Sequence, residues 1–153
     1  MSVTVCVAPA RTLAYPKGGG HLWVYLHWAL ALRALGCLVI WLEVLDPRKP
    51  MEATRSNVTA LRARLDRFGL AESLALSTPD GGPLPRDLAA SIPDLEAASE
   101  ADLLLNLWHS LPEAVVRRFR RSSLVDTDPG LLQVWMTLGS VHVAPHDLYF
   151  TIG

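Results

Sequence analysis

The chain alternates short, uniformly apolar runs with longer segments of helical periodicity. Residues 3–8 (VTVCVA) form the first apolar run, and residues 21–35 (HLWVYLHWALALRAL) are mostly good helix formers that end at Gly36. Residues 37–43 (CLVIWLE) are again rich in β-formers. Strands that are apolar on nearly all sides are typical of a parallel sheet with helices on both faces, so a right-handed strand, helix, strand unit is predicted.

The same alternation continues to the end of the chain. A helix is predicted over residues 58–68, with Asn57 as its N-cap, and a weaker one over residues 86–100. Two short helices are predicted to start at Pro112 and Pro129, because proline suits the first helical turn. The remaining apolar segments are predicted strands: residues 73–77, 101–108, 122–128 and 148–153. The predicted fold class is α/β, in one domain over residues 1–153.

Charge and composition argue against several classes of function. Lys and Arg (14) nearly balance Asp and Glu (15), and the formal net charge of -1 gives no electrostatic footprint for nucleic acid or an anionic membrane. The basic run at residues 117–121 (RRFRR) ends a short helical pattern, where cations favour the helix dipole, so it is interpreted as a solvated face. No apolar run reaches the roughly 20 residues that span a bilayer, so no integral membrane segment is expected.

Targeting and cysteine usage point to the cytoplasm. The first ten residues (MSVTVCVAPA) lack the positive region of a secretory signal. Cys6 and Cys37 lie in apolar runs without metal-ligand spacing, so both are predicted to be core thiols in a reducing compartment.

Candidate chemistry gathers where strands end. In a doubly wound sheet, ligands bind beyond the carboxyl ends of the strands. The residues at such positions are Lys17, Gly18, Gly19 and Gly20 after the first strand, Glu43 after the second, and Asn106, His109, Asp126, Asp128, His146 and Asp147 around the later ones.

The glycine loop at residues 15–23 (YPKGGGHLW) has several interpretations. A P-loop needs Gly-Lys-Ser/Thr after its glycines, and here the lysine precedes them. A dinucleotide fingerprint would place a third glycine at Trp23, although Glu43 stands where a ribose-binding acid would. Two alternatives stay open: a bare backbone that approaches a ligand at a helix N-terminus, and a simple flexible turn.

The acidic segment DTDPG at residues 126–130 could hold a hard cation through Asp126 and Asp128. No third acidic ligand follows nearby, and Asp128 is better explained as a helix cap before Pro129. No metal and no other cofactor is therefore predicted.

The histidines divide by position. His27 falls inside the apolar helix and is predicted to be a core residue. His109 and His146 lie at strand borders, where each could act as a base or hydrogen-bond donor, with packing or surface placement as the alternative. Ser122 and Ser123 lack the G-x-S-x-G context of a nucleophile, which argues against covalent hydrolysis.

Four segments, in this order, resemble the N-terminal half of glycosyltransferases with two Rossmann-like domains, the GT-B architecture. They are PKGGGHLWVYLHWALALRALGCLVIWLE, ADLLLNLWHSLP, LVDTDPGLLQVW and HDLYFTIG. Segments with D-x-D-P and FTIG are also similar to those of a group of uncharacterised glycosyltransferase-like proteins. The resemblance implies a Rossmann-like parallel sheet with helices on both faces, and covers nearly the whole chain.

The resemblance further implies an acceptor-side domain that works with a nucleotide-sugar donor bound by a C-terminal domain, without a metal. The chain is then the N-terminal part of a longer protein, and is not expected to catalyse transfer alone. The implied base candidates are His21, just after the glycine loop, and Asp126, His109 and His146. The implied substrate-binding candidates are Lys17, Gly18, Gly19, Gly20, Asn106 and Asp128. The alternatives are a non-catalytic module that binds a nucleotide or a partner protein, and, third, a dinucleotide oxidoreductase.

Overall fold

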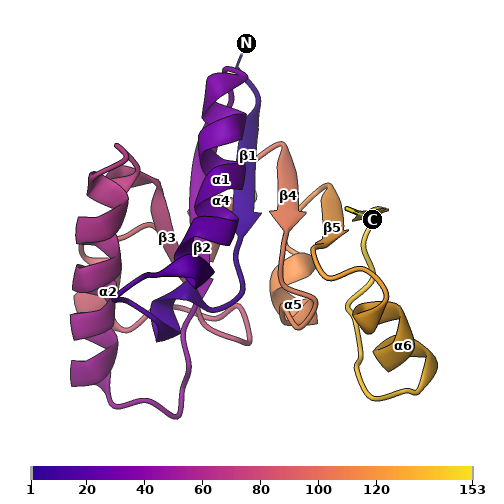
Figure 1. The fold of residues 1–153 in the computed structure, drawn as a ribbon. Helices are drawn as coiled ribbons and strands as arrows, with labels where there is room; N and C mark the ends of the chain where they lie inside the picture. The colour runs from indigo at the N-terminus through magenta and orange to yellow at the C-terminus, as the bar shows by residue number, and fades with distance from the viewer. Residues whose placement is uncertain (1, 153) are drawn as a thin grey trace.

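All six strands lie side by side in one sheet (Figure 1), in a computed structural model that describes residues 2–152. The strands are β1 (Thr4–Ala8), β2 (Leu38–Val44), β3 (Leu74–Ser77), β4 (Leu103–Asn106), β5 (Ser122–Asp126) and β6 (Leu148–Thr151). Every neighbouring pair is parallel, and the order across the sheet is β3-β2-β1-β4-β5-β6. This is the strand order of a doubly wound, Rossmann-like sheet, so the predicted fold class is confirmed.

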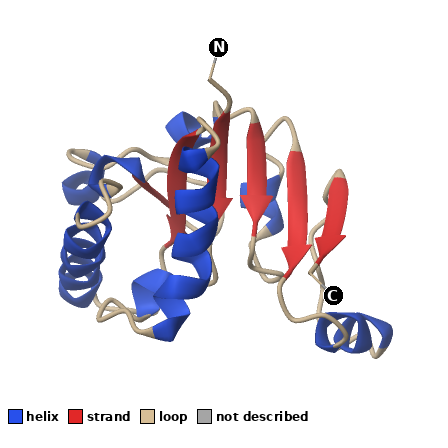
Figure 2. Ribbon diagram, turned by 45° about the horizontal axis from the view of Figure 1, so that its top comes forward, coloured by secondary structure: helices blue, strands red, loops and turns tan. Residues whose placement is uncertain are grey.

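Helices cover both faces of the sheet. They are α1 (Gly20–Ala34), α2 (Met51–Asp66), α3 (Arg86–Ala89), α4 (Leu95–Ser99), α5 (Glu113–Val116) and α6 (Leu131–Thr137), with 3-10 turns η1 (Thr12–Ala14) and η2 (Ala71–Ser73). Figure 2 shows α1 in front of the strands and α6 set apart beyond the carboxyl end of β5. Among residues 2–152, none of these helices is long and apolar enough to cross a membrane.

Strand β1 divides its side chains between two cores. Because successive side chains of a strand point to opposite faces, Val5 and Val7 pack in the cluster that contains Leu26 of α1. Cys6 points the other way and packs in the cluster that contains Val115 of α5. Burial raises the pKa of the Cys6 thiol far above its usual range, so this cysteine is an inert core residue, as predicted.

Two exposures differ from the predictions. Cys37 is only half-buried, at the rim of the cluster under α1 and α2. His27 is exposed rather than in the core. The buried residues of α1 are Leu22, Tyr25, Leu26 and Ala29, which share one side of the helix, and His27 lies on the other.

The start of α2 corrects the prediction of an N-cap at Asn57. The helix begins at Met51 with Pro50 at its N-cap, so Asn57 lies in the middle of the helix. The polar residues before Asn57 are the solvent-facing side of an amphipathic helix, with Thr54 and Val58 buried beneath them. The helix therefore starts earlier in the chain than the predicted residue 58.

The start of α6 corrects a second predicted cap. Asp128 and Pro129 form a turn, and the helix begins at Leu131 after Gly130, whose φ is 95°. The Asp128 amide donates a hydrogen bond to Asp126 Oδ1 at 3.0 Å. This side-chain contact stabilises a non-helical turn at Asp128, so Asp128 does not cap the helix. Strand β6 ends at Thr151, and the Gly153 end of the predicted segment lies outside the described residues.

Leu26→Ala tests whether α1 is held by its buried side. Leu26 is 0% exposed, and the cavity left by truncation should lower the free energy of unfolding by about 3 kcal/mol. Leu35, at the end of the same helix, is 80% exposed, and Leu35→Ala should cost less than about 0.5 kcal/mol. Urea denaturation of the two variants measures the difference, and equal losses would contradict this packing.

Candidate ligand-binding cleft

The cleft of chemical interest lies at the carboxyl ends of β1, β4 and β5. Strands β1 and β4 are neighbours, but the chain leaves β1 toward β2 on one side and leaves β4 toward β5 on the other. Such a topological switch point is where open α/β sheets bind ligands. A cleft of about 280 Å³ opens here, lined by Ala10, Tyr25, Leu107, Trp108, His109, Val125, Asp126, Thr127, Asp128, Leu131, Leu132 and Trp135.

Asp126 is the carboxylate at the base of this cleft. It ends β5, is 8% exposed, and is buried with its strand. Its Oδ1 accepts the Asp128 amide, and its Oδ2 accepts Gln133 Nε2 at 3.0 Å. Each carboxylate oxygen keeps a second lone pair, so Asp126 can also accept a hydrogen bond from a ligand hydroxyl.

Aromatic side chains form the walls. His109, in the turn after β4, lies with its ring centre 5.8 Å from that of Trp135 on α6. Tyr25 enters from α1 and Trp108 from the end of β4. Faces of this kind suit a ligand with an apolar face, while Asp126 supplies polar selectivity.

The glycine loop is shaped by the protein itself. Gly18 (φ 85°) and Gly19 (φ 79°) adopt left-handed backbone that other residues rarely take, which explains two of the three glycines. A side chain at Gly18 would collide with the guanidinium of Arg64 from α2, so the group that approaches this backbone closely is Arg64. Lys17 and the three glycines lie outside the cleft lining, although Gly19 and Gly20 are exposed at the N-terminus of α1.

His21 lies behind the cleft rather than in its lining. Its Nε2 is 2.7 Å from the Ala10 carbonyl, which can only accept, so Nε2 donates this hydrogen bond. Its ring centre is 4.9 Å from that of Tyr15 and 5.3 Å from that of Tyr25. The geometry makes His21 a support for Tyr25 and the loop after β1.

Asn106 and His146 belong to one partly buried hydrogen-bond network. His146 Nδ1 lies 2.7 Å from the Ala144 carbonyl, and its Nε2 lies 3.1 Å from Asn106 Nδ2. Asn106 Oδ1 accepts the Trp108 amide at 2.8 Å. Nδ1 must therefore donate and Nε2 accept, which is the neutral ring. Burial lowers the His146 pKa, against the opposing effects of Ala144 and Asp147.

Glu43 has a structural task in place of the ribose contact that its position suggested. It is 1% exposed within β2, where it accepts hydrogen bonds from the Thr12 hydroxyl, from the Leu13 amide at 3.0 Å and from Trp41 Nε1 at 3.0 Å. Burial raises the Glu43 pKa to about 7 although these donors oppose the shift. The carboxyl group anchors the turn that follows β1.

The structure thus brings together Asp126, Asp128 and His109 from the sequence candidates. Three residues of the cleft lining were missed: Tyr25, Trp108 and Trp135. Each carried a usable signal: Tyr25 lies one helical turn after His21, Trp108 directly precedes the candidate His109, and Trp135 follows the DTDPG segment. Tyr25 and Trp135 did not stand out in the sequence, because large side chains in apolar helices commonly pack in the core.

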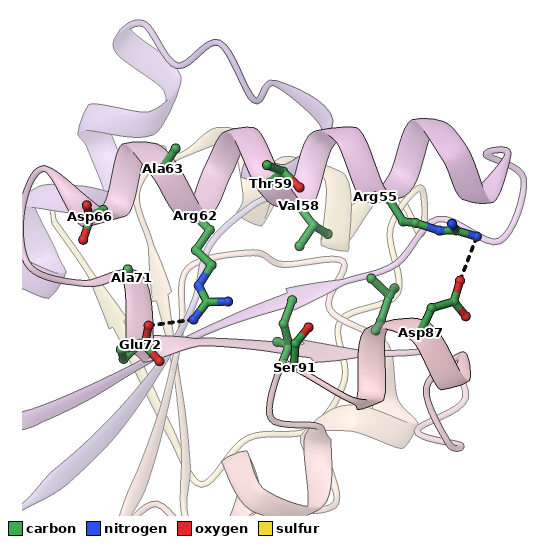
Figure 3. A pocket seen from close by; sticks show the side chains of 12 residues that line it. Arg55, Val58, Thr59, Arg62, Ala63, Asp66, Ala71, Glu72, Asp87 and Ser91 are labelled. Carbon is green, nitrogen blue, oxygen red and sulfur yellow. Dashed lines mark hydrogen bonds and ion pairs between the residues drawn. The ribbon is translucent and has the colours of Figure 1, made fainter.

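A larger groove, of about 600 Å³, runs between α2 and the segments around η2 and α3 (Figure 3). Ion pairs cross it from Arg55 to Asp87 at 2.7 Å and from Arg62 to Glu72 at 2.6 Å. The charged side chains of this groove are already paired with one another and are substantially exposed. The groove therefore exceeds the cleft in volume but has no unpaired charged group among these four to offer a ligand.

Residues 2–152 contain no group of three or more His, Cys, Asp or Glu side chains placed to hold a metal ion. No family model, no curated protein and no solved structure matches the chain. The cleft is therefore interpreted from its own geometry.

Glu43 should make stability depend on pH. Its pKa of about 7 in the folded protein exceeds the unfolded value of 4.5, so its contribution is fully present below pH 4.5 and is lost as pH rises through about 7. The loss is of order 3 kcal/mol. Glu43→Gln should be less stable overall, because the NH2 group of the new side chain faces hydrogen-bond donors. Its stability should lack the pH dependence that Glu43 causes, because glutamine does not titrate. Urea unfolding of both proteins at pH 5 and pH 8 gives the comparison; parallel pH profiles would contradict it.

Asn106→Asp should raise the pKa of His146. The new carboxylate has no N–H to donate to Nε2, and its charge favours the imidazolium form. An NMR titration of the His146 ring should show a value at least about one unit higher than in the unsubstituted protein. His109, which lies outside this network, serves as the internal reference. An unshifted His146 curve would show that the network is not formed in solution.

Proposed function

We propose that this chain is the acceptor-side domain of a glycosyltransferase, which binds a hydroxyl-bearing acceptor in the cleft between β1, β4 and β5. The observation that carries the proposal is the combination, at the switch point of the sheet, of the Asp126 carboxylate with the aromatic faces of Tyr25, His109 and Trp135. A sugar ring has an apolar face of C–H groups and a rim of hydroxyls, and the cleft offers a match for both. The resemblance of the sequence to the N-terminal half of GT-B enzymes supports the same assignment.

The proposed reaction joins the acceptor to the donor sugar. The acceptor hydroxyl oxygen forms a bond to the anomeric carbon, the bond from that carbon to the nucleoside diphosphate breaks, and the diphosphate leaves with the electron pair. A base takes the hydroxyl proton. Asp126 and His109 are the preferred base candidates because they line the cleft. His21 and His146 rank below them, because hydrogen bonds already engage Nε2 of His21 and both ring nitrogens of His146.

The proposal assigns the nucleotide-sugar donor to a second, C-terminal domain that faces this cleft. Its diphosphate would approach the exposed amides of Gly19 and Gly20 at the N-terminus of α1, where the helix dipole favours an anion. Lys17, exposed beside them, adds a positive charge. In this role the chain binds only the acceptor, and the second domain supplies the donor. The chain is therefore not expected to catalyse transfer alone.

A second candidate is a non-catalytic module that binds a partner protein. The observation that favours it is the exposed apolar edge strand β6, in which Leu148 is 55%, Tyr149 57% and Phe150 54% exposed. Exposed apolar side chains gathered on one strand are typical of interaction surfaces. This candidate predicts no saccharide binding in the cleft.

Trp135→Ala tests the acceptor site. Titration of the full chain with a panel of methyl glycosides and disaccharides, followed by amide NMR shifts, should move the signals of Asp126 to Trp135. Trp135→Ala should weaken this binding at least about tenfold, because it removes the main apolar wall. Trp23→Ala is the matched control: Trp23 is also a partly exposed tryptophan, but it packs against Phe68 away from the cleft, and its loss should leave binding unchanged.

A second variant, Asp126→Asn, separates stacking from hydroxyl recognition. It keeps the size of the side chain but removes the charge and one acceptor, so binding should again weaken, with the fold monitored by circular dichroism. Parallel titrations with UDP-glucose and NAD rank the alternatives. NAD binding in the cleft, without any saccharide shift, would overturn the proposal in favour of the dinucleotide reading.

A further inference from the structure

A second cavity adjoins the cleft. It measures about 230 Å³ and lies at the carboxyl ends of β1 and β2, where Arg11, Asp46, Arg48, Pro79, Trp108 and Pro112 line it. Trp108 lines both spaces, so the cleft and this cavity adjoin at Trp108. The first cleft offers a carboxylate and aromatic faces, whereas this cavity offers two guanidinium groups.

The backbone of Arg11 is held in an unfavourable conformation. With φ 54° and ψ 42°, Arg11 is the one non-glycine residue at positive φ among residues 2–152. Its neighbours impose this geometry: Pro9 precedes it, its own amide donates to the Pro9 carbonyl at 3.0 Å, and Thr12 with Leu13 is fixed to buried Glu43. Glycine would adopt this conformation without steric cost. Non-glycine residues held in this way are found disproportionately at ligand sites.

The side chain of Arg11 does little for the fold. Its Nη2 is 3.3 Å from Asp46 Oδ2, a long contact, and the side chain is 46% exposed. Asp46 is already held by Arg48, through Nε and Nη2 at 2.9 Å each and through the Arg48 amide at 3.0 Å. The cavity therefore contains two guanidinium groups against one carboxylate, and Arg11 retains donors that no strong partner occupies.

We propose that this cavity is an anion subsite in which Arg11, assisted by Arg48, binds a phosphate or carboxylate group of the molecule that occupies the edge of the sheet. The planar guanidinium matches both oxyanions in a two-pronged geometry. Trp108 and the two prolines give the remainder of the ligand an apolar wall. The inference rests on the proposed function only in placing a sugar in the cleft that adjoins this cavity at Trp108. It narrows the proposed substrates to molecules that carry a phosphate or carboxylate group.

Arg11→Gly tests the subsite without endangering the fold. Pyrophosphate, glucose 1-phosphate, glucuronate and glucose are titrated at constant ionic strength into the full chain, with NMR shifts followed at Arg11, Asp46 and Trp108. The three anionic probes should shift these signals, and Arg11→Gly should weaken their binding at least about tenfold. The melting temperature of this variant should be unchanged or higher, because glycine fits φ 54°.

Arg120→Gln is the matched control. Like Arg11, Arg120 is an exposed arginine with a long contact to a carboxylate, here 3.9 Å from Nη2 to Asp102 Oδ1. It should bind the anions as well as the unsubstituted protein does. If glucose 1-phosphate or glucuronate binds more tightly than pyrophosphate, the anionic group in the subsite belongs to a sugar ligand. If pyrophosphate binds more tightly, the anionic group belongs to a diphosphate. Equal affinity in Arg11→Gly, or anion shifts confined to the glycine loop, would overturn the subsite. Loss of glycoside binding in Trp135→Ala reports on the acceptor site separately, so the two proposals can fail independently.

Discussion

The carboxyl group of Glu43 fixes the part of the molecule on which the site depends. A carboxyl buried in an apolar sheet is costly unless donors satisfy it, and three donors converge on this one. Two of them come from Thr12 and Leu13, in the turn after β1, so the buried group ties that turn to β2. Arg11 precedes this turn and the glycine loop follows it. Their positions at the edge of the sheet follow from a hydrogen-bond requirement in the core.

A second polar network has the corresponding role on the other side of the switch point. Asn106 ends β4, receives the Trp108 amide and donates to His146, whose other nitrogen reaches Ala144. A neutral imidazole can satisfy both partners at once, which fits the lowered pKa of His146. The network links the end of β4 to the segment before β6 and holds the backbone of Trp108, which lines both the cleft and the cavity beside it. Both candidate subsites are therefore bordered by polar side chains that are hydrogen-bonded within the protein.

The two candidate subsites lie at the same edge of the sheet and differ in the chemical groups that line them. Around Asp126 and Trp135, the surface suits a neutral ring with hydroxyl groups. Around Arg11 and Arg48, it suits an oxyanion. A single ligand that spans Trp108 would use both, as an acceptor with a sugar ring and an acidic substituent would. The glycine loop, where Arg64 lies close to Gly18, borders this edge.

The sequence by itself determined the α/β class, the parallel strands and the edge at which to look, because uniformly apolar strands can only be buried between helices. It also placed Asp126 and His109 correctly at strand exits. It could not locate the start of α2, since the polar residues before Asn57 suit a loop and a solvent-facing helix side equally well. Only the tertiary structure decided which strand-exit residues meet. Glu43 is buried and His146 partly buried because each finds hydrogen-bond partners from distant segments. That Tyr25, Trp135 and Arg11 lie at this edge depends on tertiary contacts, which their positions in the sequence alone do not decide.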